Sequence, residues 1–343
     1  MRARALFLVA ALCAACTAVV GPDLASTPLA IYDRVWSDLD LHYSLFTVKH
    51  VNWDSLGALY RAQVTPSTND VGLSKAISRL LGSLNDDHVL FRGSRVGTSP
   101  RAGHFDLINT SPWVQYAGGF DDGISFGVIN GGVGYIAIGS FDGSGWVPEI
   151  DSALKALDGS HAMVIDVRNN EGGFLDNALA VAGRFAQTTQ TVAYVRYRNG
   201  PGHNDFTQPI AQQVSPSGTR NFAGKVFVLT GRNTISAAEL FVMAMQALGH
   251  TTAIGDTTAG ETGGPLAREL QNGWSYQFPE SIEFQLNGDV FEGIGLAPDV
   301  PVRNSFTLSG TIVDAQLAKA ISLATGVVNS SVRPGAAAMG NRH

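Results

Sequence analysis

The stretch KVFVLTGRNTISAAELFVMAMQALGH, residues 225–250, joins a strand-like run to a helical one. Residues 226–229 are all apolar, which is typical of a short buried strand. After the turn residues 231–234, apolar side chains recur at the spacing of a helix, and Ser236 stands where the pattern changes. A buried strand that leads directly into a helix is the repeating unit of α/β proteins.

The same unit occurs twice more upstream. The strand-like run AMVIDVR is followed by the turn NNEGG and the helical stretch FLDNALAVAGRFA, and GVGYIAIGSF precedes the helical stretch WVPEIDSALKAL. These alternations predict an α/β core with a mostly parallel sheet and flanking helices over residues 102–328. A hairpin is expected around QNGWSYQFP and SIEFQLNG, a last helix is expected over residues 313–323, and the polar tail 329–343 is expected to be disordered.

The N-terminal part has a different pattern. IYDRVWSDLDLHYSLF and VGLSKAISRLLGSL carry apolar residues at intervals of three and four, which indicates amphipathic helices. We therefore expect a small helical N-terminal domain over residues 27–95, ahead of the core.

Residues 1–20 have the pattern of a signal peptide. Arg2 and Arg4 precede the apolar stretch ALFLVAALCAA, which is too short for a membrane-spanning helix. Cys16 follows small residues, so two outcomes are open: a periplasmic or membrane-anchored lipoprotein acylated at Cys16, or a plainly secreted protein. Cys13 and Cys16 are the only cysteines, so the mature chain is expected to lack an internal disulfide, a cysteine nucleophile and a cysteine-based metal site.

The overall charge also narrows the choice of partners. The net charge is -6, and the chain has no basic run, which argues against a nucleic-acid partner. We predict neither a metal nor a cofactor, and the sequence gives no oligomeric state.

Two turns between strand and helix are candidates for chemistry. Gly172 and Gly173 leave their backbone N–H groups unshielded, and the N–H of Ala237 lies at a helix start just after Ser236. Together these donors could form an oxyanion hole, with Ser236 as nucleophile. The structural alternatives are a tight turn at the two glycines and a capping box between Ser236 and Glu239.

A serine nucleophile needs a base. Among eight histidines, His88 in LNDDHVLF is flanked by carboxylates at the expected domain junction. Such a setting can hold an imidazole in a cleft, although a purely structural histidine fits the same pattern.

Five motifs together carry a family resemblance. LNDDHVLF, VIDVRNNEGG, TISAAELF, TTAGETGG and EGIGLAPDV occur in the order found in C-terminal-processing (tail-specific) serine peptidases and tricorn-core peptidases, and the similarity runs over about residues 32–302. The resemblance implies a ClpP/crotonase-like fold and a serine endopeptidase that acts on peptides or proteins through an acyl-enzyme.

The resemblance also assigns roles. The tail-specific branch takes its base from the lysine of T-x-G-K, but Glu261 stands at that position here. The branch similar to the tricorn core and to interphotoreceptor retinoid-binding protein uses the histidine of D-x-H, which Asp86-Asp87-His88 matches. The resemblance thus implies Ser236 as nucleophile, His88 as base and Glu292 as orienting acid, with Glu261 or Glu239 as alternative acids.

Departures from the family leave alternatives open. Residues 92–132 are too few for the PDZ module of tail-specific members, so substrate choice is expected to depend on the cleft itself. A non-catalytic ligand- or peptide-binding protein on the same fold, and an esterase with the same triad, are the other two hypotheses.

Overall fold

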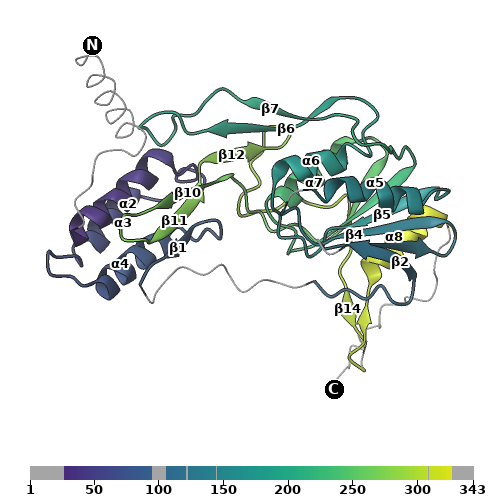
Figure 1. Ribbon diagram of the computed structural model, residues 1–343, viewed down its shortest axis with the longest axis horizontal. Coiled ribbons are helices and arrows are strands. Elements are labelled where there is room, and N and C mark those ends of the chain that lie inside the picture. The colour runs from purple at the N-terminus through teal and green to yellow at the C-terminus, as the bar shows by residue number, and fades with distance from the viewer. Residues whose placement is uncertain (1–26, 95–105, 121–122, 144, 308, 327–343) are drawn as a thin grey trace, which may run out of the picture.

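Figure 1 shows the computed structural model, which describes residues 27–94, 106–120, 123–143, 145–307 and 309–326. The expected signal peptide, Cys16 and the tail 329–343 lie outside the described residues, so those expectations stay predictions. Within the described ranges, no helix combines the length and the apolar character needed to cross a membrane.

A seven-stranded sheet forms the centre of the core, in the order β13-β9-β8-β5-β4-β3-β2. Its strands are β2 (Val114–Phe120), β3 (Ile124–Ile129), β4 (Val133–Ile138), β5 (Ala162–Asp166), β8 (Lys225–Thr230), β9 (Thr251–Gly255) and β13 (Val300–Pro301). The five strands from β13 to β4 are parallel, and β3 and β2 extend the sheet in antiparallel fashion. The predicted α/β core with a mostly parallel sheet is confirmed.

Helices cover both faces of this sheet (Figure 1). Along β5, Met163 and Ile165 pack in one apolar cluster with α5 (Val147–Ala156), α6 (Leu175–Ala182) and α7 (Ala237–Ala247). Val164 points to the opposite face, where it packs in a cluster with α8 (Ala315–Thr325). Successive side chains of a strand point to opposite faces of the sheet. Because both faces of β5 are covered by helices, all of its residues at these positions are apolar.

The N-terminal helices pack against strands from a distant part of the sequence. The helices are α2 (Pro28–His42), α3 (Trp53–Arg61) and α4 (Asp70–Gly82), and they share an apolar cluster with Trp274, Tyr276 and Phe278. These aromatic residues belong to a three-stranded sheet, β1-β11-β10, made of β1 (Leu90–Arg92), β11 (Ser275–Pro279) and β10 (Pro265–Glu269). The helical unit therefore contains an antiparallel sheet that was not expected from the sequence. An isolated hairpin is only marginally stable, so the apolar face of β10 and β11 needs the N-terminal helices as a packing partner. The predicted limits 27–95 and 102–328 stay predictions.

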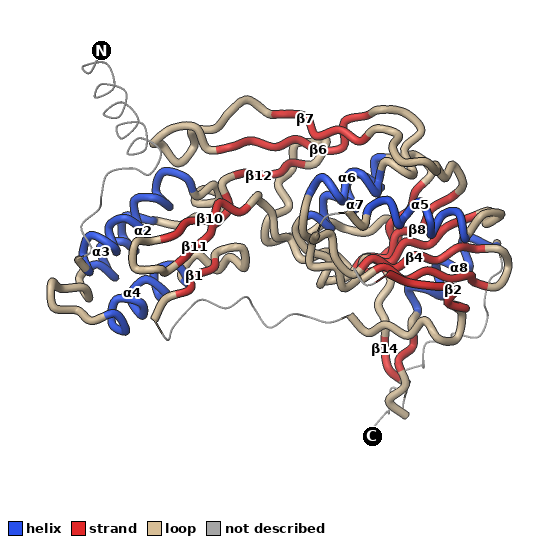
Figure 2. The backbone as a smooth tube through the Cα atoms, in the orientation of Figure 1, coloured by secondary structure: helices blue, strands red, loops and turns tan. Residues whose placement is uncertain are grey.

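A third sheet runs between this unit and the core (Figure 2). It has the order β12-β6-β7, with β12 (Ser281–Phe284), β6 (Gln190–Tyr197) and β7 (Ile210–Val214). A small ladder of β14 (Ser305–Phe306) and β15 (Ile312–Val313) precedes α8. At the end of β6, the guanidinium of Arg198 donates to the carbonyl oxygens of Tyr43 and Asp40, both at 3.2 Å. This contact fixes the helical unit to the third sheet.

Candidate functional site

The two candidate loops lie side by side because β5 and β8 are parallel neighbours. Parallel strands end at the same edge of a sheet, so the loops that follow them meet. The amide of Ile235 donates to the carbonyl of Asn170 at 3.0 Å. The hydroxyl of Thr234 donates to the carbonyl of Val167 at 2.9 Å, and both groups are buried. The loop that carries Ser236 is thereby tied to the loop that carries the glycine pair.

Ser236 adopts an unusual backbone conformation, with φ 56° and ψ −121°. Among the described non-glycine residues, only His50 and Asn85 also have positive φ. Such a conformation costs about 1–3 kcal/mol and is typical of functional turns. The capping-box arrangement expected from the spacing is present, since the Glu239 carboxylate accepts from the Ser236 amide at 3.1 Å. Ser236 thus begins α7 and sits on a sharp strand-to-helix turn.

The glycine pair leaves room directly beside this serine. A Cβ added to Gly172, whose φ is 96°, would lie 2.9 Å from the Ser236 Cβ and 3.0 Å from the Ala237 nitrogen. The amide of Gly172 is already engaged, because it donates to the Asn170 side chain at 2.8 Å. The amides of Gly173 and Ala237 donate to no residue of the described chain. Of the three expected oxyanion donors, Gly173 and Ala237 are available, and Gly172 serves the loop itself.

His88 lies in the turn before β1, on the helical unit. Its backbone N–H donates to Asp86 at 2.9 Å, and its carbonyl accepts from Gln277 at 3.4 Å. Its Nδ1 is buried and has no hydrogen-bond partner in the described part of the chain. Within that part, no hydrogen bond joins its imidazole to Ser236 or Glu292. The turn is fixed, and the ring is not engaged with either expected partner.

Glu292 is buried, with 7% of its surface exposed. Its Oε2 accepts from the Thr262 amide at 2.8 Å and from the Thr262 hydroxyl at 3.1 Å. Its Oε1 forms an ion pair with Lys49 Nζ at 2.7 Å. Burial and the neighbouring Asp86 raise the pKa of this carboxyl, while Lys49 opposes the rise. No sequence pattern pointed to Lys49, which is a single lysine in the turn before α3.

A polar cavity of about 200 Å³ gathers the acidic groups of the site. It is lined by Lys49, Asn85, Asp86, Asp87, Ala259, Gly260, Glu261, Glu292 and Gly293. The pKa of Glu261 is raised to about 8 by burial and by a hydrogen bond and repulsion from the Asp87 carboxyl. Glu261 therefore holds a proton at neutral pH, and its contact with Asp87 joins the His88 turn to the loop after β9.

Glu239 connects this cavity to the serine. Its buried carboxylate accepts from the amides of Ser236, Gly260 and Glu261 and from the Thr258 hydroxyl, at 2.5–3.1 Å. Burial raises its pKa to about 7 despite these donors. Four donors leave this group no capacity to orient a histidine, so the structure gives Glu239 a framework role.

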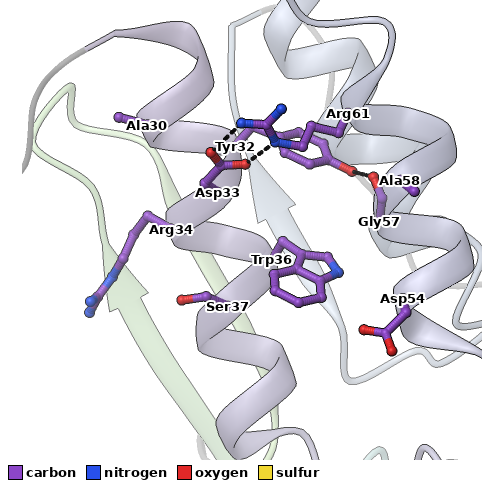
Figure 3. A pocket seen from close by; sticks show the side chains of 10 residues that line it. All are labelled: Ala30, Tyr32, Asp33, Arg34, Trp36, Ser37, Asp54, Gly57, Ala58 and Arg61. Atoms are coloured by element: carbon purple, nitrogen blue, oxygen red, sulfur yellow. Dashed lines mark hydrogen bonds and ion pairs between the residues drawn. The ribbon is translucent and has the colours of Figure 1, made fainter.

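A larger cavity, of about 770 Å³, lies on α2 and α3 (Figure 3). Asp33 and Arg61 form an ion pair at its rim at 2.6 Å, and the Tyr32 hydroxyl donates to the Gly57 carbonyl at 2.9 Å. None of the expected catalytic residues lines this cavity, so it is separate from the site around Ser236.

Comparison of the chain with known proteins identifies related sequences. The sequence profile of peptidase family S41 matches residues 132–302, about half of the chain. The carboxy-terminal processing protease CtpB of Bacillus subtilis (strain 168) is 26% identical over 173 residues, which are 50% of this chain and 34% of that protein. This chain therefore spans about a third of the length of that curated relative.

Solved structures extend the likeness to most of the chain. The structure of a candidate peptidase from Parabacteroides merdae ATCC 43184 is 27% identical, with a TM-score of 0.76, and covers 90% of this chain and 100% of that one. The tricorn protease is 16% identical, with a TM-score of 0.55, and covers 88% of this chain and 36% of that one. This second match shows the fold alone and confirms the expected ClpP/crotonase-like architecture. The chain belongs to peptidase family S41, a family of serine-type peptidases.

Proposed function

We propose that this protein is a serine endopeptidase with Ser236 as its nucleophile. The observation that carries the proposal is the strained Ser236 at the start of α7, which is followed directly by the Ala237 amide and lies beside Gly172, the neighbour of Gly173. The amides of Ala237 and Gly173 donate to no group of the described chain. Strain at a serine, combined with available donors at a helix N-terminus, supports acyl transfer, since the developing oxyanion needs fixed donors.

The reaction follows from these groups. The Ser236 Oγ attacks the peptide carbonyl, its proton passes to the base, and the carbonyl oxygen becomes an oxyanion bound by Gly173 and Ala237. The base returns the proton to the leaving amine as the C–N bond breaks, which leaves an acyl-enzyme. A water molecule then attacks the acyl-enzyme in the same way, which releases the carboxylic acid product and restores the Ser236 hydroxyl.

His88 is the proposed base, and Glu292 the proposed orienting acid. The support for His88 is its place on a fixed turn beside Asp87, whose carboxyl contacts Glu261. The support for Glu292 is that it is buried and lines the polar cavity that Asp87 and Glu261 also line. A hydrogen bond from His88 to Ser236 and one to Glu292 require movement of the imidazole, whose Nδ1 is buried and has no partner in the described chain.

Labelling with a fluorophosphonate probe tests the proposal. The full chain should be labelled and should cleave an unstructured protein, whereas Ser236→Ala should lose both properties and unfold at nearly the same temperature. His88→Asn should reduce the labelling rate by about 10²-fold or more, the usual contribution of a general base. Labelling that persists in Ser236→Ala would overturn the proposal.

A second function, a peptide-binding protein without hydrolysis, is favoured by one observation. Glu292 is paired with Lys49 and, in the described chain, not with His88. An unlabelled wild-type protein that still binds unstructured peptides would support this alternative. Labelling and hydrolysis only of small esters would instead indicate an esterase.

A further inference from the structure

Lys49 joins two parts of the site that come from opposite ends of the sequence. Its side chain is only 15% exposed, and its Nζ lies 2.7 Å from Oε1 of Glu292. The same Nζ donates to the carbonyl oxygen of Asn85 at 3.1 Å. Asn85 begins the turn that carries Asp86, Asp87 and His88, so one ammonium contacts both this turn and the Glu292 carboxylate.

Backbone strain concentrates at the same place. The described non-glycine residues with positive φ are His50 at 54°, Asn85 at 48° and Ser236 at 56°. His50 follows Lys49 directly, and Asn85 provides the carbonyl that Lys49 binds. Each such conformation costs about 1–3 kcal/mol and persists only where surrounding contacts enforce it. The backbone is therefore held in a defined conformation at both residues of the Lys49–Asn85 hydrogen bond.

We propose that Lys49 is a positioning residue for the reaction at Ser236. Its ammonium fixes the turn that carries His88 relative to the Glu292 carboxylate and keeps that carboxylate ionised. This inference rests on the proposed function, because it gives Lys49 a role in organising the base and the acid assigned there.

The charges around Glu292 explain why a cation is needed. The Glu292 carboxylate is repelled by every neighbouring acid that is ionised. These acids are Asp86, Glu261, Glu283 and the Tyr43 hydroxyl. Lys49 is the cation that opposes them in the described chain. Without it, a buried carboxylate beside Asp86 would take up a proton at higher pH. A neutral Glu292 could not stabilise the imidazolium that forms during acyl transfer.

The ion pair also excludes a different role. A lysine that accepts the serine proton must be neutral and must reach the serine, whereas Lys49 is held by the Glu292 carboxylate and the Asn85 carbonyl. Lys49 therefore acts through its charge and its hydrogen bonds, not as the base.

The test compares Lys49→Met, Lys49→Arg and a matched control, Lys75→Met, on an exposed face of α4. The measurement is the rate of fluorophosphonate labelling and of peptide hydrolysis between pH 5 and pH 9. We expect Lys49→Met to lose about 100-fold at neutral pH, in the range of a misplaced acid–base group. Its acidic limb should move to higher pH, whereas Lys49→Arg should keep the wild-type limb and Lys75→Met should match wild type.

Two results would overturn the inference: a wild-type profile in Lys49→Met, or an equal loss at every pH with no displaced limb. If Lys49→Met does not fold, the double variant Lys49→Met/Glu292→Gln removes both charges and should fold, because no buried charge is left unpaired. That variant should then remain slow, and wild-type rates in it would also contradict the inference.

A double-mutant cycle separates this inference from the proposed function. Urea unfolding of Lys49→Met, Glu292→Gln and the double variant measures their coupling without any reaction. If the two substitutions are strongly coupled but no fluorophosphonate labels the wild-type protein, the Lys49–Glu292 contact is supported and the proposed peptidase function is rejected. Additive effects would reject the positioning role, whatever the activity.

Discussion

The backbone amides of Ser236 and Glu261 donate to one oxygen atom, Oε2 of Glu239, at 3.1 and 2.9 Å. The candidate nucleophile and the loop that forms the acidic cavity are thus fixed by a single buried carboxylate. Glu239 is the fourth residue of the expected capping box, so a common helix-start motif here also sets the geometry of a site. This double use explains how Ser236 can be both a cap and a candidate nucleophile.

The strain at Ser236 should be measurable as stability. Ser236→Gly should be more stable than Ser236→Ala by about 1–3 kcal/mol, because glycine adopts φ 56° without a steric penalty. Both variants lack the hydroxyl, so the difference reports the backbone alone. The measurement is urea unfolding of the two proteins.

Ser152, exposed on α5, provides the control for this comparison. There the order should reverse, with Ser152→Gly less stable than Ser152→Ala by about 1 kcal/mol, the usual cost of glycine in a helix. An equal preference for alanine at both positions would mean that Ser236 is not strained.

The space beside Ser236 should be sensitive to one methyl group. Gly172→Ala places its Cβ 2.8 Å from the Ile235 carbonyl oxygen and 2.9 Å from the Ser236 Cβ, so the serine turn must shift. We expect loss of fluorophosphonate labelling and a destabilisation of about 2–4 kcal/mol from clash and positive φ together.

Gly159→Ala is the matched variant for that experiment. Gly159 has φ 91°, close to the 96° of Gly172, but a Cβ there meets no atom within 4 Å. It should cost only about 1 kcal/mol and leave labelling unchanged. A similar loss in both variants would show that backbone conformation, and not proximity to Ser236, explains the effect at Gly172.

The sequence predicted the part of the site that depends on local pattern. Ser236 and the glycine pair follow neighbouring parallel strands, and such strands bring their following loops together wherever the alternation of strand and helix is recognised. The contact of Lys49 with Glu292 has no such pattern, because it depends on how the helical unit packs against the core.

The limits of pattern reading also appear in the sheets. β2 was not predicted as a strand, since its sequence VQYAGGF contains two glycines and is largely exposed, which weakens the apolar signal. A hairpin was expected around QNGWSYQFP and SIEFQLNG, but β11 of the first stretch pairs with β10, and β12 of the second pairs with β6. The docking of the β10–β11 hairpin on the N-terminal helices was not expected either. Its apolar residues specify burial and leave the partner open.

Protonation of Glu261 should make stability depend on pH. Its pKa is raised to about 8 in the folded protein from an ordinary value of 4.5, so the unfolded chain releases this proton first as the pH rises. Between those two values the unfolded state binds fewer protons, and the free energy of unfolding therefore falls with rising pH. Glu261→Gln removes this contribution. Compared with wild type, the variant should gain about 1–2 kcal/mol between pH 5 and pH 8.5, a value reduced for the water that screens a half-buried carboxyl.

Urea unfolding at the two pH values measures this gain, with Glu269→Gln, exposed on β10, as the control. The control should differ from wild type by the same amount at both pH values. Glu239 and Glu283, whose pKa values burial raises to about 7, add a slope of the same sign that both variants retain. Because that shared slope cancels in each comparison with wild type, a pH-independent difference for Glu261→Gln would mean that the pKa of Glu261 is not raised in the folded protein.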